Sequence, residues 1–497
     1  MLKSTRGPMV YAIALLASLA IGWIFVTATT FHGDDYLFRT FGQLEPHPFT
    51  AFFADKHGGE YYRPVPMALW WVIERLSGGR TWPFALVALS LHGLCAFALS
   101  RLSRRLGADT STQWRTALLF FCSAAQVEAA LWFSASTDLL ATFGILSALS
   151  LCLAPGRGAF LLALGATALA LASKETALCL PVLIVLAKRW FDPRVSGSWS
   201  RAAMASLLFF MVSSLYLVVR FTILRGEGGA GDPSALPYAR AMQVAAGLLQ
   251  VLGGYGPWST EASLALGAVA LALIAWFTRK DGVGMRFAWS FVLVASLLLP
   301  FAGWVVGARY FYLPAAGLVL LLGQALRGRP VWVVGVLVCL FAGQSVVVGR
   351  ARGRDIRRYE TTLATAKQAV LASRAAGHRI FLFRGAVKDL DLALKLDHGI
   401  APKIQDVLVI PDVPASFARI PADLRARTQF LLADPPLPPS GAYRFVGGEV
   451  VGLARRDESP SLDEVLDHLP DLRFIRLSHG EKGAVRWSDF TKDMQRP

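Results

Sequence analysis

The sequence predicts a polytopic α-helical membrane protein that ends in a small soluble α/β domain. Of its 497 residues, 54% are hydrophobic and only 17% are charged, and the mean hydropathy is +0.47, which departs from the averages of soluble proteins. The apolar residues are gathered in runs long enough to cross a bilayer, and these runs end near residue 348. We therefore expect a membrane domain over residues 1–348 and a soluble domain over residues 349–497.

Eleven apolar runs are candidates for membrane-spanning helices, which need about 20 residues each. The first run follows Lys3 and Arg6 and is longer than the apolar core of a signal peptide, so we expect an uncleaved anchor. Several runs are separated by only a few residues, which predicts antiparallel helical hairpins. The expected spans are 9–28, 82–101, 116–133, 138–154, 158–173, 176–190, 202–222, 262–278, 286–305, 311–326 and 330–348.

The basic residues predict the orientation of these spans. Lys and Arg gather in alternate short loops, as the positive-inside rule requires of cytoplasmic loops, and this accounts for much of the net charge of +16 without nucleic acid as a partner. The segment 241–257 is also apolar, but as a span it would move Arg279, Lys280, Arg327 and Arg329 outside. We expect it to be an interfacial or re-entrant helix.

A second group of charged residues, of both signs, is expected on the outer side. The positive-inside rule does not explain this group. Ionisable residues near the membrane are costly unless they are paired, solvated or functional. These residues come from separate outer loops and are the candidates for a site: Asp34, Asp35, Arg63, Glu128, Asp138, Lys174, Glu175 and Arg309.

Asp34 and Asp35 open the long first outer loop, residues 30–81. One carboxylate can act as a general base for an incoming nucleophile while the other orients that nucleophile or binds substrate. We favour Asp34 as the base, because the residue nearer the span is expected to be more desolvated. The alternative is that the pair caps a helix that starts at Tyr36.

Tyr62 and Arg63 precede a short apolar helix near Met67–Ile73, which we expect along the membrane plane. The planar guanidinium of Arg63 can hold a phosphate with two N–H groups. Alternatively, it snorkels to lipid phosphates.

The remaining outer turns offer cations and carboxylates. Glu128 lies inside an apolar helical run and needs a partner or a cavity, whereas Asp138 could simply cap the next span. Lys174 and Glu175 are neighbours that cannot face each other on a helix, so they must serve different partners. Lys174 and Arg309 are further candidates for holding a phosphate, and Tyr310 for stacking on a sugar or polyprenyl chain.

The sequence contains few signals for other classes of protein. We find no phosphate-binding Gly-rich loop between strand and helix, no HExxH and no GxSxG motif. A divalent metal is compatible with the charged residues but no ligand spacing indicates one. The cysteines are expected to be buried thiols without disulfides; they are Cys95, Cys122, Cys152, Cys179 and Cys339.

The C-terminal segment has ordinary charge density and short apolar runs at 379–383, 406–411 and 429–432, which predict strands. Counting spans places this domain outside. The basic run Arg350–Arg358 opposes that placement under the positive-inside rule, and contact with anionic headgroups would reconcile the two.

Five motifs in order resemble those of the transmembrane-and-TPR protein O-mannosyltransferases and their bacterial relatives, which belong to the GT-C superfamily of polyprenyl-phosphate-sugar-dependent glycosyltransferases. The resemblance covers roughly residues 30–320, but no TPR array follows. The motifs are the acidic pair, Tyr62-Arg63-Pro64, the turn Val127–Leu140, Ser173-Lys174-Glu175, and Arg309–Pro314.

The resemblance implies an integral membrane enzyme that moves a sugar, with inversion, from a polyprenyl phosphate to an extracytoplasmic acceptor. Asp34 or Asp35 would be the base, and Lys174 and Arg309 would hold the donor phosphate with Arg63. Tyr62, Glu128, Asp138, Glu175 and Tyr310 would bind substrate or support the site. The expected location is a bacterial inner membrane with the site facing the periplasm. The acceptor, whether protein, lipid or glycan, stays open, as do a transporter or flippase and a non-catalytic partner in envelope polysaccharide assembly.

Overall fold

The computed structural model divides into two compact units, which we describe separately. The first comprises Met1–Thr29 and Phe41–Arg354, and the second comprises Thr30–Thr40 and Asp355–Pro497. The division passes through helices α2 and α16. The residues described are 22–23, 29–53, 61–195, 197–224, 237–253, 260–278, 282–299 and 308–375, with strand residues 380–383, 408–409, 442–446, 449–454, 472–479 and 485–489.

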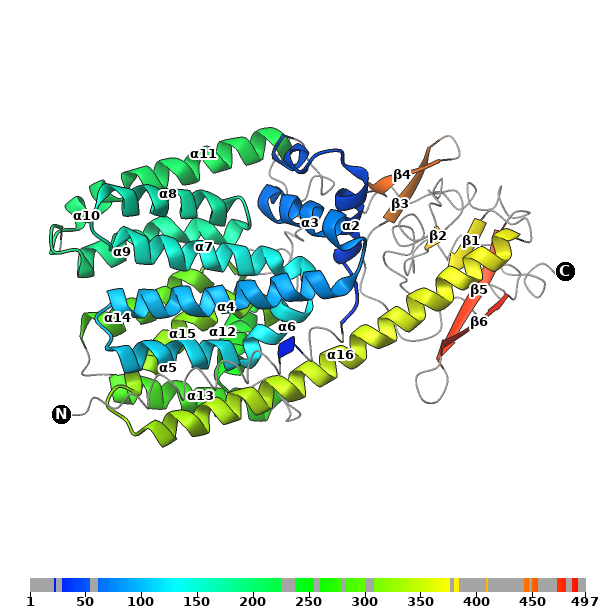
Figure 1. The fold of residues 1–497 in the computed structure, drawn as a ribbon. Helices are drawn as coiled ribbons and strands as arrows, with labels where there is room; N and C mark the ends of the chain where they lie inside the picture. The colour runs from blue at the N-terminus through cyan, green and yellow to red at the C-terminus, as the bar shows by residue number, and fades with distance from the viewer. Residues whose placement is uncertain are drawn as a thin grey trace. The chain divides into compact units, whose positions relative to one another are not determined.

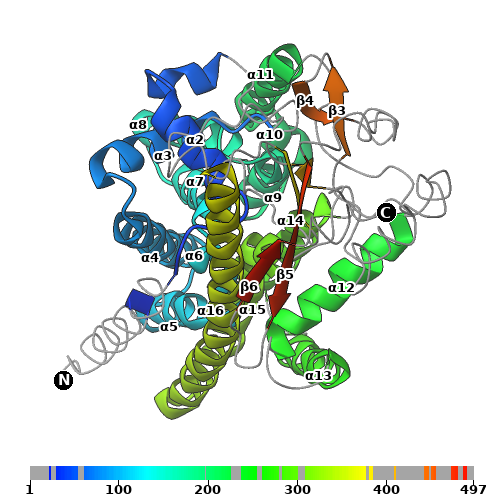
Figure 2. The same cartoon turned by 90° about the vertical axis from the view of Figure 1, so that its right-hand side faces the viewer.

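The first unit is a bundle of apolar helices (Figure 1). Helix α4 packs against α5 and α7, α7 against α8, α14 against α15, and α12 against α13, and the last pair lies side by side in both views (Figure 2). The bounds are α4 Thr81–Arg105, α5 Thr110–Cys122, α6 Val127–Leu131, α7 Ser136–Cys152, α8 Arg157–Leu171, α9 Leu180–Phe191, α10 Trp199–Ala205, α11 Leu207–Leu224, α12 Pro237–Gly253, α13 Thr260–Thr278, α14 Val283–Ser296 and α15 Tyr312–Ala325.

Among the described residues, four helices are long and apolar enough to cross a membrane: Thr81–Arg105, Phe133–Cys152, Leu207–Leu224 and Val331–Thr361. Shorter apolar helices cover Arg157–Leu171, Ala241–Leu252, Glu261–Trp276 and Val283–Ser296. Except for the first, every expected span has a helix within its bounds; span 9–28 lies outside the described residues apart from Gly22 and Trp23. The chain is thus a polytopic helical membrane protein.

The expected span 116–133 is wrong in its bounds. Helix α5 ends at Cys122, and Ser123 takes an extended conformation with φ −68° and ψ 133°. Two short 3-10 turns, Ala124–Gln126 and Phe133–Ala135, then flank α6. Glu128 therefore lies in a short helix between two spans and not inside a span.

The loop 30–81 contains two short helices, and the second of them is tied to the bundle. After α2, Asp35–Leu44, and the turn Pro48–Phe52 comes α3, Pro64–Ser77. The indole of Trp70 donates a 3.2 Å hydrogen bond to the Ser136 hydroxyl at the start of α7. The backbone N–H of Val65 donates to the Ala172 carbonyl at the end of α8. The expected apolar helix at 67–73 is thus present, and these two bonds hold its first half against the ends of α7 and α8.

The long helix α16, Val331–Ala375, crosses the expected domain boundary at residue 348 without a break. The basic run Arg350–Arg358 belongs to this helix. Beyond it, four strands form a sheet in the order β2-β1-β5-β6, in which β1 is parallel to β2 and β5, and β6 is antiparallel to β5. A separate hairpin joins β3 and β4. The bounds are β1 Ile380–Phe383, β2 Leu408–Val409, β3 Ala442–Val446, β4 Glu449–Ala454, β5 Leu472–His479 and β6 Val485–Asp489.

Two of the three expected strands, near 379–383 and 406–411, coincide with β1 and β2, and the third, 429–432, lies outside the described residues. The five cysteines carry no disulfide, and four of them are buried as expected. Cys339 is exposed on α16, which corrects that part of the prediction. An apolar run predicts burial in protein or in lipid alike, and the sequence did not show that other helices cover so little of α16.

Candidate active site

Helix α3 positions Arg63 near the ends of α7 and α8. Arg63 is the residue that immediately precedes the helix, and proline at the first helical position suits a start at this point because proline has no N–H to leave unpaired. The neighbouring bond from Val65 to the end of α8 brings Arg63 to the turn that follows that helix. This turn carries Lys174 and Glu175.

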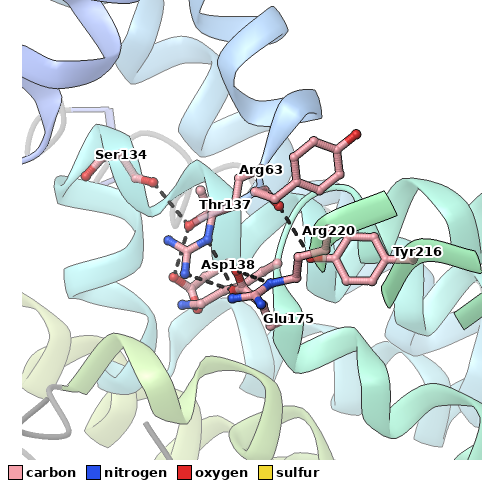
Figure 3. A network of polar contacts seen from close by, with 9 residues as sticks. Arg63, Ser134, Thr137, Asp138, Glu175, Tyr216 and Arg220 are labelled. Atoms are coloured by element: carbon pink, nitrogen blue, oxygen red, sulfur yellow. Dashed lines mark hydrogen bonds and ion pairs between the residues drawn. The ribbon is translucent and has the colours of Figure 1, made fainter. Parts of the chain in front are cut away.

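Arg63, Glu175 and Arg220 form a half-buried cluster (Figure 3). The guanidinium of Arg63 donates through Nε at 3.3 Å and through Nη2 at 3.0 Å to one oxygen of Glu175. Arg220 of α11 approaches the other oxygen, with 4.0 Å between its Nε and Glu175 Oε1. Burial alone would raise the pKa of Glu175, but the charges of Arg63 and Arg220 and hydrogen bonds lower it below its ordinary value. The pKa of Arg63 is raised, because the charge and hydrogen bonds of Glu175 outweigh the opposing effect of burial. Arg63 is thus directed at Glu175, and its contact with a lipid phosphate stays a prediction.

Two tyrosines support this cluster. Tyr216 lies one turn before Arg220 on α11, and its hydroxyl donates a 3.4 Å hydrogen bond to the Tyr62 carbonyl. The two rings lie 6.0 Å apart between centroids. The backbone just before Arg63 is thus fixed to the same helix that supplies Arg220.

Lys174 and Asp138 form a second, more deeply buried ion pair. The distance from Lys174 Nζ to Asp138 Oδ1 is 2.5 Å, and the two side chains are 5% and 7% exposed. Asp138 is the third residue of α7, whose N-terminal capping position is Ala135 with no side-chain cap, so the capping alternative for Asp138 is wrong. Lys174 and Glu175 serve different partners, as the sequence predicted.

Arg309 lies among aromatic rings and next to Glu128. Its guanidinium carbon is 3.8 Å from the centroid of Trp132 and 5.2 Å from that of Tyr310. Its backbone N–H donates a 3.0 Å hydrogen bond to Glu128 Oε2, and Arg352 of α16 pairs with Glu128 Oε1 at 3.1 Å. Both oxygens of Glu128 are thus engaged by the protein, which supplies the partner that the sequence required.

These groups form one continuous network near the start of α7, the end of α8 and the start of α15. The Lys174 ammonium lies 4.6 Å from the Tyr310 centroid and so connects the Asp138 pair to the Arg309 turn. The charge of Asp138 also contributes to the raised pKa of Arg63, which connects it to the Glu175 cluster. Eight residues singled out in the sequence thereby come together: Tyr62, Arg63, Glu128, Asp138, Lys174, Glu175, Arg309 and Tyr310.

The network gathers several cations in one place. Among the described residues, Arg63, Lys174, Arg220, Arg309 and Arg352 take part in it, together with the carboxylates Glu128, Asp138 and Glu175. Clustered cations in a partly buried site attract negative charge. The arrangement is therefore suited to receive an anion.

Asp34 and Asp35 belong to the second unit, and their surroundings differ from the expectation. Asp35 is fully buried, and its Oδ2 accepts a 3.1 Å hydrogen bond from the backbone N–H of His32. Asp34 is partly exposed, and its carbonyl accepts bonds from Leu37 and Phe38 at the start of α2. The residue nearer the span is thus the less buried one, so the physical reason for preferring Asp34 was wrong.

Sequence reasoning missed Arg220, Tyr216, Trp132 and Arg352. A signal for Arg220 was available, because an arginine inside the apolar run 202–222 needs a partner. Arg352 was hidden in a run of arginines, where nothing distinguishes one from the next.

No protein-family model matches the chain, and no curated protein matches it in sequence. Among solved structures, ArnT from Cupriavidus metallidurans in the apo state is similar, with 12% identity, 98% of each chain covered and a TM-score of 0.54. ArnT from the same organism bound to undecaprenyl phosphate has 13% identity, covers 99% of this chain and 100% of its own, and gives a TM-score of 0.52. At such low identity the likeness shows the fold alone. The chain thus shares the fold of ArnT over nearly its whole length.

Proposed function

We propose that this protein is a GT-C glycosyltransferase that moves a sugar from a polyprenyl phosphate to an acceptor on the outer side of the membrane. The observation that carries the proposal is the gathering of Arg63, Lys174 and Arg309, which come from three separate turns, in one network. The fold shared with ArnT supports the superfamily, and one of the ArnT structures holds undecaprenyl phosphate.

A gathering of cations suits the chemistry of this reaction. An acceptor hydroxyl gives its proton to an aspartate and attacks the anomeric carbon, while the bond from that carbon to the phosphate oxygen breaks with inversion. The phosphate leaves with the electron pair and so gains negative charge. Fixed cations that offset this charge stabilise the transition state more than the ground state.

The cations do not contribute equally to holding the phosphate. The Lys174 side chain is 5% exposed and pairs with Asp138 at 2.5 Å, whereas the Arg63 side chain is 16% exposed. Because the guanidinium of Arg63 is more accessible and can present two N–H groups to a phosphate, we assign the stronger phosphate contact to Arg63. Arg220 and Arg309 lie beside it, and Lys174 supports the site. Tyr310, between Lys174 and Arg309, offers a ring for the sugar or the polyprenyl chain.

The base is assigned to the acidic pair. Asp35 is held by the His32 backbone and suits an orienting role, and Asp34 is the more accessible carboxylate. The outer side corresponds to the periplasm if the host is a bacterium with an inner membrane. A divalent metal is not required by this assignment.

The test is transfer by the full-length protein in nanodiscs from an undecaprenyl-phosphate-linked radiolabelled sugar to acceptors in a membrane extract. Asp34→Asn is expected to reduce transfer by at least a hundredfold, since general-base catalysis contributes roughly 10²–10⁴-fold. Arg220→Gln is expected to weaken the binding of undecaprenyl phosphate itself. Arg327→Gln, an exposed arginine that pairs with Asp109, is the control for loss of one positive charge.

Full transfer by both Asp34→Asn and Asp35→Asn would refute the base assignment. Equal affinity of wild type, Arg220→Gln and Arg327→Gln for undecaprenyl phosphate would refute the phosphate site. The acceptor class can be identified by mass spectrometry of envelope glycans, lipids and glycoproteins after deletion of the gene.

A further inference from the structure

His92 lies near the middle of α4, one of the helices able to cross the membrane, and is 3% exposed. The chemistry proposed above does not use it. A polar side chain at such a depth must be satisfied by protein and is rarely retained without a role. Its partners show what that role is.

The two ring nitrogens of His92 bind two different helices. Nδ1 lies 2.8 Å from the hydroxyl of Tyr312, the first residue of α15. Nε2 lies 3.1 Å from the carbonyl oxygen of Phe121, near the end of α5. A carbonyl can only accept, so Nε2 carries the proton, and in the neutral imidazole Nδ1 accepts from the Tyr312 hydroxyl.

Aromatic packing fixes the ring in this position. The imidazole stacks on Phe121 with 4.6 Å between centroids and at 29° between planes. Tyr312 meets Phe120 edge-on at 5.4 Å. Both Tyr312 and Phe120 are fully buried, so bulk water does not reach the Tyr312 hydroxyl.

Both partners of His92 lead directly into the candidate site. Tyr312 follows the turn Ala308–Phe311, which carries Arg309 and Tyr310. Phe121 precedes Ser123, where the chain leaves α5 and turns towards Glu128. One imidazole thus holds the two segments whose contact is made by the Glu128 carboxylate and the Arg309 backbone.

We propose that His92 is a positioning residue, which sets the placement of Arg309 and Tyr310 relative to Glu128 and Trp132 through Tyr312 and the Phe121 carbonyl. It touches neither donor nor acceptor. This inference rests on the proposed function for its effect on phosphate binding, but the positioning itself can be measured without any ligand.

The experiment uses full-length protein in nanodiscs, with hydrogen exchange of peptides covering 308–313 and 124–131 and affinity for undecaprenyl phosphate as readouts. Tyr312→Phe removes one hydroxyl and keeps the ring, and His92→Leu removes both hydrogen bonds. His92→Asn keeps an amide oxygen near Nδ1 for Tyr312. Thr167→Val is the matched control, because it removes a buried hydroxyl that donates to the Ala163 carbonyl of its own helix, α8.

Tyr312→Phe and His92→Leu are expected to speed exchange in the two segments while exchange elsewhere stays unchanged, and to weaken undecaprenyl phosphate binding about tenfold, as for loss of a buried hydrogen bond. His92→Asn is expected to restore protection of 308–313, and Thr167→Val to behave as wild type. Unchanged exchange in both segments in both variants would overturn the inference. If the variants lose protection in the two segments but the wild-type protein binds no undecaprenyl phosphate, the positioning role is upheld and the proposed function is refuted.

Discussion

The buried pair of Lys174 and Asp138 shows how individual residues are coupled in this site. Each side chain is less than a tenth exposed, so removal of one leaves the other charge buried. Breaking a buried pair from one side costs about 3–5 kcal/mol, much more than the net worth of the pair.

We therefore expect Asp138→Asn and Lys174→Met to destabilise the protein singly by about 3–5 kcal/mol each. The double variant should be destabilised by much less than the sum of the two. The measurement is chemical unfolding in detergent micelles followed by tryptophan fluorescence. Additive losses would show that the two groups are not a coupled pair.

Glu175 gives the site a defined dependence on pH. Its pKa is below the ordinary value because Arg63 and Arg220 outweigh the effect of burial. A carboxyl whose pKa is depressed by folding stabilises the folded state above the unfolded pKa, about 4.3, and this contribution is lost as the pH falls through the folded pKa.

Wild type should therefore be more stable than Glu175→Gln at pH 7 and at pH 5, with the difference disappearing as the pH falls well below 4. Melting temperatures of the two proteins across this range measure the effect. Asp109→Asn should show the same sign, because the effect of burial is outweighed by hydrogen bonds from Thr112 and the charge of Arg327, which lower the pKa of Asp109 as well. A difference between wild type and Glu175→Gln that grows towards acid would contradict the sign.

At the scale of elements, the close approach of α7 and α8 depends on Gly144. A Cβ at this position would lie 2.8 Å from the Ala166 carbonyl oxygen and 2.8 Å from the Ala170 Cβ. Small residues allow helix backbones to approach in this way within membranes. Helix α7 carries Asp138, and the turn after α8 carries Lys174.

Gly144→Val should thus separate α7 from α8, destabilise the protein by about 1–3 kcal/mol as other overpacking substitutions do, and weaken the Lys174 pair. Gly165→Ala on α8 is the matched control, since a Cβ there meets no atom within 4 Å. Thermal unfolding compares the two variants. Equal stability of Gly144→Val and Gly165→Ala would show that the helices tolerate a wider spacing.

At the scale of the whole molecule, the orientation in the membrane can be tested at the two ends of α4. Two exposed residues mark the two ends of α4: Arg80 immediately precedes the helix, and Thr110 follows the short turn after it. We expect Arg80 on the outer side and Thr110 on the cytoplasmic side, because the basic residues Arg101, Arg104 and Arg105 cluster at the second end of α4.

An impermeant maleimide applied to intact spheroplasts should label Arg80→Cys and spare Thr110→Cys until the membrane is opened, in a background that lacks Cys339. The four buried native cysteines should not react in the folded protein. Labelling of Thr110→Cys in sealed spheroplasts would show that the topology is the reverse of the predicted one and that the candidate site faces the cytoplasm.

Hydropathy by itself determined that the chain is a polytopic membrane protein and where most of its helices lie, because long apolar runs have no other stable placement. It also determined which charges needed partners: Lys174 and Glu175 could not share one, and Glu128 could not stay alone. Only tertiary structure decided the partners themselves. Asp138 with Lys174, Glu128 with Arg352 and Glu175 with Arg220 join residues at least 36 positions apart, and local periodicity carries no information about such distances. The end of α5 at Cys122, inside the expected span 116–133, is likewise visible only in the structure, where the carbonyl oxygen of Phe121 lies 3.1 Å from His92 of another helix.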